Sequence, residues 1–255
     1  MSDKFKDKFR LDRQTMALRV AKEFQDGDYV NLGIGIPVLA SNYVPAGREV
    51  VFHSENGVLG FGQVHTAGEG DPDFVNAGGQ PVTIIPGTAF FDHHESFSIV
   101  RGRHLDISVM GGLQVSEKGD LANWLVPERQ IGTIGGAMDL AVGAKKLIIA
   151  MNHVTKDNQP RIVKKCSYEL TAVECVKLVV TDIAVIEVTK KGLVLKEFAP
   201  SWTPAEVQEL VKNTQLPPGF SFDVGGATRD QEEAFGAMLG ALALSIVFIY
   251  IVLAS

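Results

Sequence analysis

The sequence predicts a layered α/β protein, with a largely parallel sheet and helices on both of its faces. Short apolar runs rich in β-branched residues alternate with helix-compatible segments and glycine-rich turns, as in sheets whose strands are covered on both sides. Many of the 26 glycines follow the expected strands, where a backbone without side chains can approach a ligand closely. We therefore expect the functional site along the carboxyl edge of the sheet.

The first expected element is an amphipathic helix. Asp12 can cap its start, Met16, Val20 and Phe24 recur at helical spacing, and Gly27 is expected to end it. Strands are then expected at residues 29–34, 49–53, 82–85, 107–110, 147–151 and 183–188.

The composition changes near residue 213, which divides the chain into three expected parts. Residues 1–213 form the α/β domain, and residues 214–233, with their glycines and prolines, are typical of a linker. Residues 234–255 carry no formal charge and are numerous enough to span a bilayer as an apolar helix. Any contact with a membrane is expected through residues 234–255 alone.

Composition and charge disfavour several classes of protein. A hydrophobic content of 45% over 255 residues supports a folded core, and a net charge of −6 without any basic run disfavours a nucleic-acid partner. The spacing of Cys166 and Cys175 fits neither a redox motif nor a zinc site. Two reduced thiols and a charged N-terminal segment without an apolar stretch indicate a cytoplasmic protein.

Glu55 is the sharpest candidate for chemistry. It follows an apolar strand and lies in the turn Ser54-Glu55-Asn56-Gly57, from which its side chain can project into a crevice. Glutamate carboxylates are ionised at neutral pH and can attack an activated acyl group to form an anhydride without a metal. The alternative is a solvated loop residue, which the local sequence alone favours.

Other motifs argue against a cofactor. Gly33-Ile34-Gly35 resembles a dinucleotide loop, but Val38 stands where the third glycine is needed, and no GxxxxGK[ST] phosphate loop occurs. The run at residues 93–95, His-His-Glu, is expected on an extended segment, where neighbouring side chains point to opposite faces. We therefore expect no metal and no redox cofactor.

The segment Phe52–Gly60 resembles the active-site signature of family I coenzyme A-transferases, in which this glutamate carries coenzyme A as a thioester. Residues 31–37, 76–78, 119–124 and 135–140 resemble further blocks of the same family, in the same order. The resemblance covers about residues 10 to 213 and is strongest toward the β-type subunits of the 3-oxoacid enzymes.

This resemblance implies a fold similar to coenzyme A-transferases and ribose-5-phosphate isomerase. It also implies transfer of coenzyme A between succinyl-CoA or acetyl-CoA and a 3-oxoacid such as acetoacetate, through a glutamyl-CoA thioester on Glu55. Gly136 matches the glycine whose backbone N–H stabilises the oxyanion. An α-type subunit is implied as the partner, in an assembly such as α2β2. The other expected substrate-site residues are Gly33, Gly35, Asn56, Gly57, Gly135 and Asn123.

Several alternatives stay open. The acid could be 3-oxoadipate, and a sugar-phosphate isomerase-like protein would share the fold. Residues 216–254 resemble a fragment of a resistance-nodulation-division efflux transporter over about 40 residues, so a membrane-tethered binding protein without catalysis is a third class. Trp124 is a core or ligand-contact residue. Candidates for the phosphates of coenzyme A, with solvated surface charge as the alternative, are Arg101, Arg103, Lys164 and Lys165.

Overall fold

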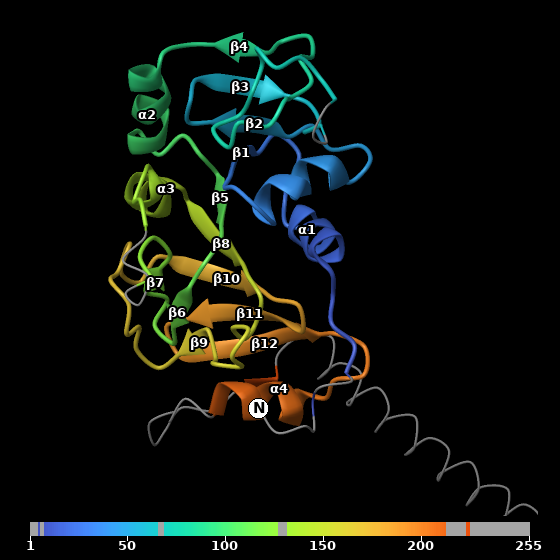
Figure 1. Ribbon diagram of the computed structural model, residues 1–255, viewed down its shortest axis with the longest axis vertical. Coiled ribbons are helices and arrows are strands. Elements are labelled where there is room, and N and C mark those ends of the chain that lie inside the picture. Colours follow the sequence, from blue (N-terminus) through green and yellow to red (C-terminus); the bar gives the residue numbers. More distant parts are fainter. Residues whose placement is uncertain (1–4, 6–7, 66–68, 127–131, 213–222, 225–255) are drawn as a thin grey trace, which may run out of the picture.

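The computed structural model describes residues 5, 8–65, 69–126, 132–212 and 223–224. A ten-stranded sheet runs through this part of the chain in the order β13-β12-β11-β10-β8-β5-β1-β2-β3-β4 (Figure 1). Its five central strands run parallel to one another, which confirms the expected, largely parallel sheet. They are β1 (Tyr29–Leu32), β2 (Val51–Ser54), β5 (Ile107–Met110), β8 (Lys146–Ala150) and β10 (Val176–Val180).

The flanks of the sheet are mainly antiparallel. On one side β2 pairs with β3 (Val58–Phe61), which pairs with β4 (Ala89–Phe90). On the other, β10 pairs with β11 (Ala184–Thr189), which pairs with β12 (Gly192–Phe198), and β13 (Asp223–Val224) joins β12 in parallel. A small second sheet consists of β7 (Leu121–Ala122), β6 (Gln114–Ser116) and β9 (Ile162–Val163).

Helices cover both faces of the large sheet, as expected (Figure 1). Alternate residues of β8 show this. Ile148 shares a hydrophobic cluster with Val20 of α1 (Arg13–Ala21), whereas Leu147 shares the opposite cluster with Val100 of α2 (His93–Arg101) and Leu140 of α3 (Ala137–Gly143). The 3-10 helix η2 (Pro37–Tyr43) packs against α1. Helix α4 (Pro204–Lys212) packs against β12, and its buried residues belong to the same hydrophobic cluster as those of α2 and α3. Burial on both faces explains why these strands are unbroken apolar runs.

The first helix begins where the sequence predicts and ends earlier. Asp12 caps it, because its Oδ1 accepts a hydrogen bond of 2.7 Å from the backbone N–H of Thr15. The helix ends at Ala21, so the expectation that it extends to Gly27 is wrong. Phe24 nevertheless reaches the core, since a turn closed by the N–H of Phe24 and the carbonyl of Ala21 continues the same face.

The prediction of a strand at residues 82–85 is also wrong. Val82 forms an isolated bridge with Val64 rather than part of a ladder. Pro81 and Pro86 flank the segment and have no N–H to donate, which prevents a continuous ladder there.

The two C-terminal parts predicted from the sequence, residues 214–233 and 234–255, lie almost wholly outside the described residues. The linker-like segment 214–233 is described at Asp223 and Val224 alone, and the apolar segment 234–255 is not described. Among the helices of the described residues, none combines the length and apolar character that a membrane span requires.

Candidate active site

Glu55 lies in the tight turn that joins β2 to β3. The N–H of Gly57 donates to the carbonyl of Ser54 over 3.0 Å, and the N–H of Phe91 donates to the carbonyl of Gly57 over 3.0 Å. Gly57 has a φ of +105°, and a Cβ at this position would lie 1.9 Å from the carbonyl oxygen of Phe91. The turn is therefore held against the chain before α2, and the closeness of that chain explains the glycine.

Asn31 on β1 fixes one oxygen of the Glu55 carboxylate. Its Nδ2 donates to Oε2 over 3.0 Å and lies 3.2 Å from both Nδ1 and the carbonyl oxygen of His53. The carboxylate oxygen and the carbonyl oxygen can only accept hydrogen bonds, so the amide nitrogen rather than the amide oxygen of Asn31 must face Glu55. No described residue hydrogen-bonds to Oε1 of the half-buried Glu55. One carboxylate oxygen is thus anchored and the other is free to react.

His53 lies beneath this pair and is 1% exposed. Because its Nδ1 accepts from Asn31, its proton is on Nε2, which lies 2.9 Å from Oγ of Ser96 on α2. Burial lowers the pKa of His53 below its ordinary value, although the charge of Glu55 and the contact with Ser96 act in the opposite direction. A neutral imidazole therefore supports Glu55 at physiological pH.

Helix α2 connects Glu55 to Gly136. Nδ1 of His93, at the start of α2, lies 3.0 Å from the carbonyl oxygen of Glu55, and the His93 ring packs on Phe97 with centroids 4.6 Å apart. Phe97 faces Gly136, where an added Cβ would lie 2.6 Å from its Cζ. Gly136 is the N-cap residue of α3, which lies beside α2 in Figure 1. Glu55 and Gly136, which are 81 positions apart in the sequence, are therefore connected through one face of α2.

Comparisons with known proteins give the family of this chain. Residues 13–210 match the coenzyme A transferase family. The chain belongs to the coenzyme A transferase family.

Two relatives and one solved structure show what this coenzyme A transferase is similar to. It is 50% identical to the β-type subunit of 3-oxoadipate CoA-transferase from Pseudomonas putida over 202 residues, which are 79% of this chain and 94% of the relative. It is 47% identical to succinyl-CoA:3-ketoacid coenzyme A transferase 2A, mitochondrial, of Rattus norvegicus over 214 residues, which are 83% of this chain and 40% of that longer one. The fold resembles glutaconate coenzyme A-transferase from Acidaminococcus fermentans with a TM-score of 0.62 at 19% identity, over 86% of this chain and 88% of that one.

The glycines expected near the substrate of this coenzyme A transferase have different local roles. The N–H of Gly33 donates to the carbonyl of Val109 over 2.8 Å, which ties the end of β1 to β5. Gly35 has a φ of +99° and Gly135 a φ of +50°, so both adopt backbone conformations that favour glycine. No atom lies within 4 Å of a Cβ added at Gly135, which leaves the backbone before α3 open.

The two expected asparagines both hold backbone. Nδ2 of Asn56 donates to the carbonyl of Val75 over 2.7 Å and fixes the Glu55 turn against that loop. Asn123 accepts a 2.6 Å hydrogen bond from Oγ1 of Thr171 and donates to the carbonyl of Gly111 over 3.4 Å. None of these described contacts joins Asn123 to Glu55, and its place at the substrate stays a prediction.

The expectation of an extended segment at residues 93–95 is wrong, because α2 begins at His93. Asp92 caps the helix, with Oδ1 accepting from the N–H of Glu95 over 2.8 Å. His93 thereby turns toward the backbone of Glu55.

The candidate contacts of the coenzyme A phosphates are mixed. Arg101 forms an ion pair of 2.9 Å with Asp139 of α3 and so braces two helices, while Arg103, Lys164 and Lys165 are exposed. Trp124 is half-buried, and its Nε1 is buried without an acceptor among the described residues.

Sequence reasoning missed the residues that support Glu55, namely Asn31, His53, His93, Ser96 and Phe97. For two of these residues the sequence contained a feature that could have revealed them. Asn31 and His53 are polar residues inside otherwise apolar strands, and both are buried. Because buried polar side chains need hydrogen-bond partners, Asn31 and His53 could each be expected to make a polar contact. The identity of the partner could not be predicted, because it depends on the pairing of β1 with β2, in which Asn31 lies opposite His53.

Proposed function

We propose that this chain is the glutamate-bearing subunit of a 3-oxoacid CoA-transferase and that Glu55 is its covalent nucleophile. The observation that carries the proposal is the state of the Glu55 carboxylate, with Oε2 held by Asn31 and Oε1 unoccupied by any described residue. A carboxylate held in one orientation loses less freedom on reaching the transition state than a mobile one.

The proposed reaction begins with attack of Oε1 on the thioester carbonyl of the donor acyl-CoA. The carbon–sulfur bond breaks, and coenzyme A leaves as a thiolate while an acyl-glutamyl anhydride forms. The thiolate then attacks the side-chain carbonyl of Glu55 and expels the donor carboxylate, which leaves a glutamyl-CoA thioester. The acceptor carboxylate repeats these two steps in reverse order, so Glu55 is regenerated and the acceptor leaves as its CoA thioester.

Each attack places negative charge on the carbonyl oxygen, and the N–H of Gly136 is the proposed donor to it. No described residue accepts a hydrogen bond from this N–H, which leaves it available to an oxyanion. Because the nucleophile is an ionised carboxylate, the scheme needs neither a metal nor a redox cofactor.

The partner in this proposal is an α-type subunit, in an assembly such as α2β2. The relatives support it, since one is a single subunit of its enzyme and another is a longer chain of which this one covers 40%. The substrate pair proposed is succinyl-CoA or acetyl-CoA with acetoacetate. The second candidate is 3-oxoadipate, favoured by the 50% identity to the Pseudomonas putida protein.

Trapping tests the proposal directly. The full chain and its α-type partner are incubated with acetoacetyl-CoA, treated with borohydride and digested for mass spectrometry. Reduction of the thioester should convert Glu55 alone to the alcohol, and Glu55→Gln should remove both the label and the exchange activity. Label on another residue, or activity in Glu55→Gln, would show that Glu55 is not the nucleophile.

A comparison of kcat/KM for succinyl-CoA with acetoacetate and with 3-oxoadipate identifies the acid. The acid with the higher value is the physiological class, and exchange with neither would overturn both candidate reactions.

A further inference from the structure

Two buried polar atoms on neighbouring strands have no hydrogen-bond partner among the described residues. They are Oδ1 of Asn31 on β1 and Oγ of Ser108 on β5. Both side chains are fully buried. A buried polar group without a partner costs free energy, so each of these atoms needs a hydrogen-bond partner.

Strand pairing places the two side chains opposite each other. Asn31 pairs with Ser108 in the parallel ladder of β1 and β5, so both project from the same face of the sheet. Nδ2 of Asn31 contacts His53 and Glu55, which lie on the side of β2. Oδ1 is at the other edge of the planar amide and is therefore turned toward β5, where Ser108 lies.

This face of the sheet is the one that α2 covers. Val30 and Ile107, which precede Asn31 and Ser108 in their strands, belong to the hydrophobic cluster on the side of α1. Asn31 and Ser108 therefore point to the opposite side, as does His53, whose Nε2 lies 2.9 Å from Ser96 of α2. His53, Asn31 and Ser108 thus form a polar row across β2, β1 and β5.

A single water molecule fits between the last two members of this row. Neighbouring strands lie about 4.8 Å apart, which is too far for a direct hydrogen bond and close to the span of one bridging water. A water that donates to Oδ1 of Asn31 and accepts from the hydroxyl of Ser108 gives both atoms a partner.

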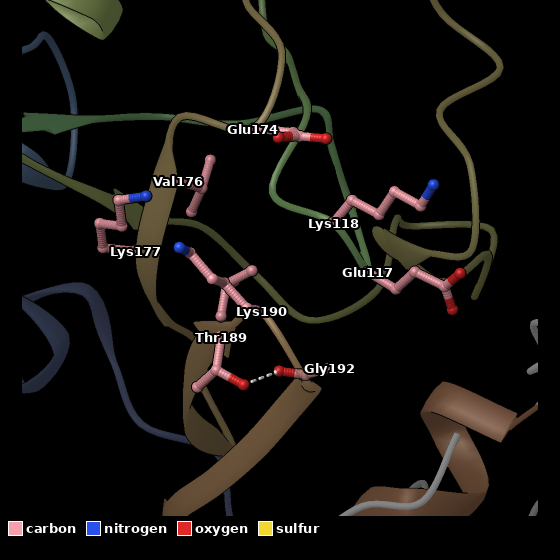
Figure 2. A pocket seen from close by; sticks show the side chains of 9 residues that line it. Glu117, Lys118, Glu174, Val176, Lys177, Thr189, Lys190 and Gly192 are labelled. Carbon is pink, nitrogen blue, oxygen red and sulfur yellow. Dashed lines mark hydrogen bonds between the residues drawn. The ribbon is translucent and has the colours of Figure 1, made fainter. Parts of the chain in front are cut away.

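An unpartnered atom by itself does not indicate a bound molecule. Oε2 of Glu117 is also buried without a partner among the described residues, and Glu117 borders a cavity beside β10, β11 and β12. Figure 2 shows its carboxylate turned away from Lys177 and Lys190, which line the other side of that cavity. Asn31 and Ser108 differ from Glu117 because the strand register brings two unpartnered atoms together.

We propose that Ser108 is a positioning residue of the transfer reaction, and that a buried water between its Oγ and Oδ1 of Asn31 holds the amide with Nδ2 toward Glu55. The inference rests on the proposed role of Glu55 as the nucleophile. When Oδ1 is held, rotation of the amide by half a turn breaks hydrogen bonds at both of its edges, so the donor to Oε2 stays in place.

The effect of Ser108→Ala on stability tests the water bridge by its sign. Removal of Oγ weakens the support of Asn31, so the midpoint of urea denaturation of the full chain should decrease. A hydroxyl group that had no partner in the folded chain would give the opposite sign, because its removal would relieve the cost of burying it. A midpoint that is unchanged or raised would overturn the proposal.

Exchange kinetics with the α-type partner test the positioning role. Ser108→Ala should lower kcat about three- to tenfold and leave the KM for acetoacetyl-CoA unchanged, as expected for loss of a neutral hydrogen bond. In the Asn31→Ala background it should have no further effect, because Ser108 acts through Asn31. The control is Ser41→Ala, at a buried serine of η2 that donates to the carbonyl of Val38, and it should leave kcat unchanged. Equal losses from Ser108→Ala in both backgrounds would exclude this role.

Hydrogen exchange of the Asn31 side chain separates this proposal from that of Glu55. In the full chain with nitrogen-15 in its asparagines, the NH2 signals of Asn31 are assigned by their loss in Asn31→Ala. Their exchange with solvent should be about three- to tenfold faster in Ser108→Ala, since one hydrogen bond fewer opposes local opening. This difference should persist even if Glu55 proves not to be the nucleophile, whereas equal exchange rates would show that the bridge itself does not exist.

Discussion

Asn31 and Glu55 are joined by a hydrogen bond of 3.0 Å between Nδ2 and Oε2, across two neighbouring strands. Asn31 is fully buried, so its side chain has no alternative position in solvent. The donor therefore determines which carboxylate oxygen is presented to a substrate.

Removal of this donor should slow the reaction without unfolding the protein. We expect Asn31→Ala to lower kcat/KM roughly ten- to a hundredfold, which corresponds to the loss of one hydrogen bond to a charged group. The loss should fall mainly on kcat, measured in the exchange assay with the α-type partner. Asn152→Ala, at an exposed position, is the control. Equal kinetics for the two variants would exclude a positioning role for Asn31.

Gly57→Ala should disrupt the turn that carries Glu55. The new methyl group would meet the carbonyl oxygen of Phe91 at 1.9 Å, and the φ of +105° is unfavourable for alanine. We expect a loss of about 3 kcal/mol or more in the free energy of unfolding, measured by urea denaturation. Gly47→Ala is a matched control, because Gly47 has a φ of +82° with no atom within 4 Å, and it should cost only about 1 kcal/mol. Equal losses would show that contact with Phe91 is unimportant.

Gly136→Ala should separate α2 from α3. Its Cβ would lie 2.6 Å from Cζ of Phe97, so the first turn of α3 must shift and activity should fall at least about tenfold, as expected for a displaced oxyanion donor. Gly111→Ala has open space around the new Cβ and serves as the control.

The added substitution Phe97→Leu shortens the opposing side chain. If it restores activity to Gly136→Ala, the glycine is needed for spacing between the helices. Activity that stays low in a folded double variant would indicate that the added Cβ itself obstructs the substrate, because alanine keeps the backbone N–H.

The stability of the protein should decrease as the pH falls below about 6.5, because of His153. This side chain is fully buried, and burial lowers its pKa from 6.5 to about 4. Below pH 6.5 the unfolded chain binds a proton that the folded chain does not, so protons favour unfolding. Between pH 7 and pH 5 the free energy of unfolding should fall by about 2 kcal/mol from this residue.

Urea denaturation at both pH values measures the decrease, and His153→Gln should make it smaller. His94→Gln, at an exposed histidine, should leave it unchanged. The range ends at pH 5 because Glu206, whose pKa is lowered to about 2 chiefly by its hydrogen bond with Lys8, loses its own contribution at lower pH. A decrease of the same size in His153→Gln would assign it to other groups.

The two cysteines should be unreactive in the folded protein. Burial raises the pKa of Cys166 to about 12 and that of Cys175 to about 11, so the thiolate that reacts with iodoacetamide is scarce at pH 7.5. Mass spectrometry should find little alkylation of either residue before denaturation and complete alkylation afterwards. Rapid labelling of the folded chain would contradict these environments.

Four of the five central strands, β1, β2, β5 and β8, could be predicted from sequence because burial on both faces leaves a local mark, an unbroken apolar run. The fifth, β10, was missed because Lys177 interrupts its apolar residues. β12 was missed because Lys196 and Glu197 interrupt its apolar residues, and it is stabilised by pairing with β11 rather than by composition. The segment at 82–85 failed in the opposite way, since it has the composition of a strand but lies between prolines.

The candidate site also has a part that the sequence predicts and a part that it does not. Glu55 and Gly136 could be selected because their sequence blocks resemble a known family. Their connection through His93 and Phe97 could not, because it depends on a helix that the sequence did not predict and on the packing of that helix against α3. Register and packing are properties of two segments together, and neither segment contains them alone.

Helix α2 has a further consequence for how this site can change during evolution. His93 and Phe97 are four residues apart, so they lie on one face of the helix, and a tilt of α2 would carry the Glu55 turn and the start of α3 in the same direction. An insertion of one residue between them would instead rotate Phe97 by about 100° around the helix axis and away from Gly136. The first turn of α2 should therefore tolerate substitutions on its outer face while its length stays constant among active descendants of this chain.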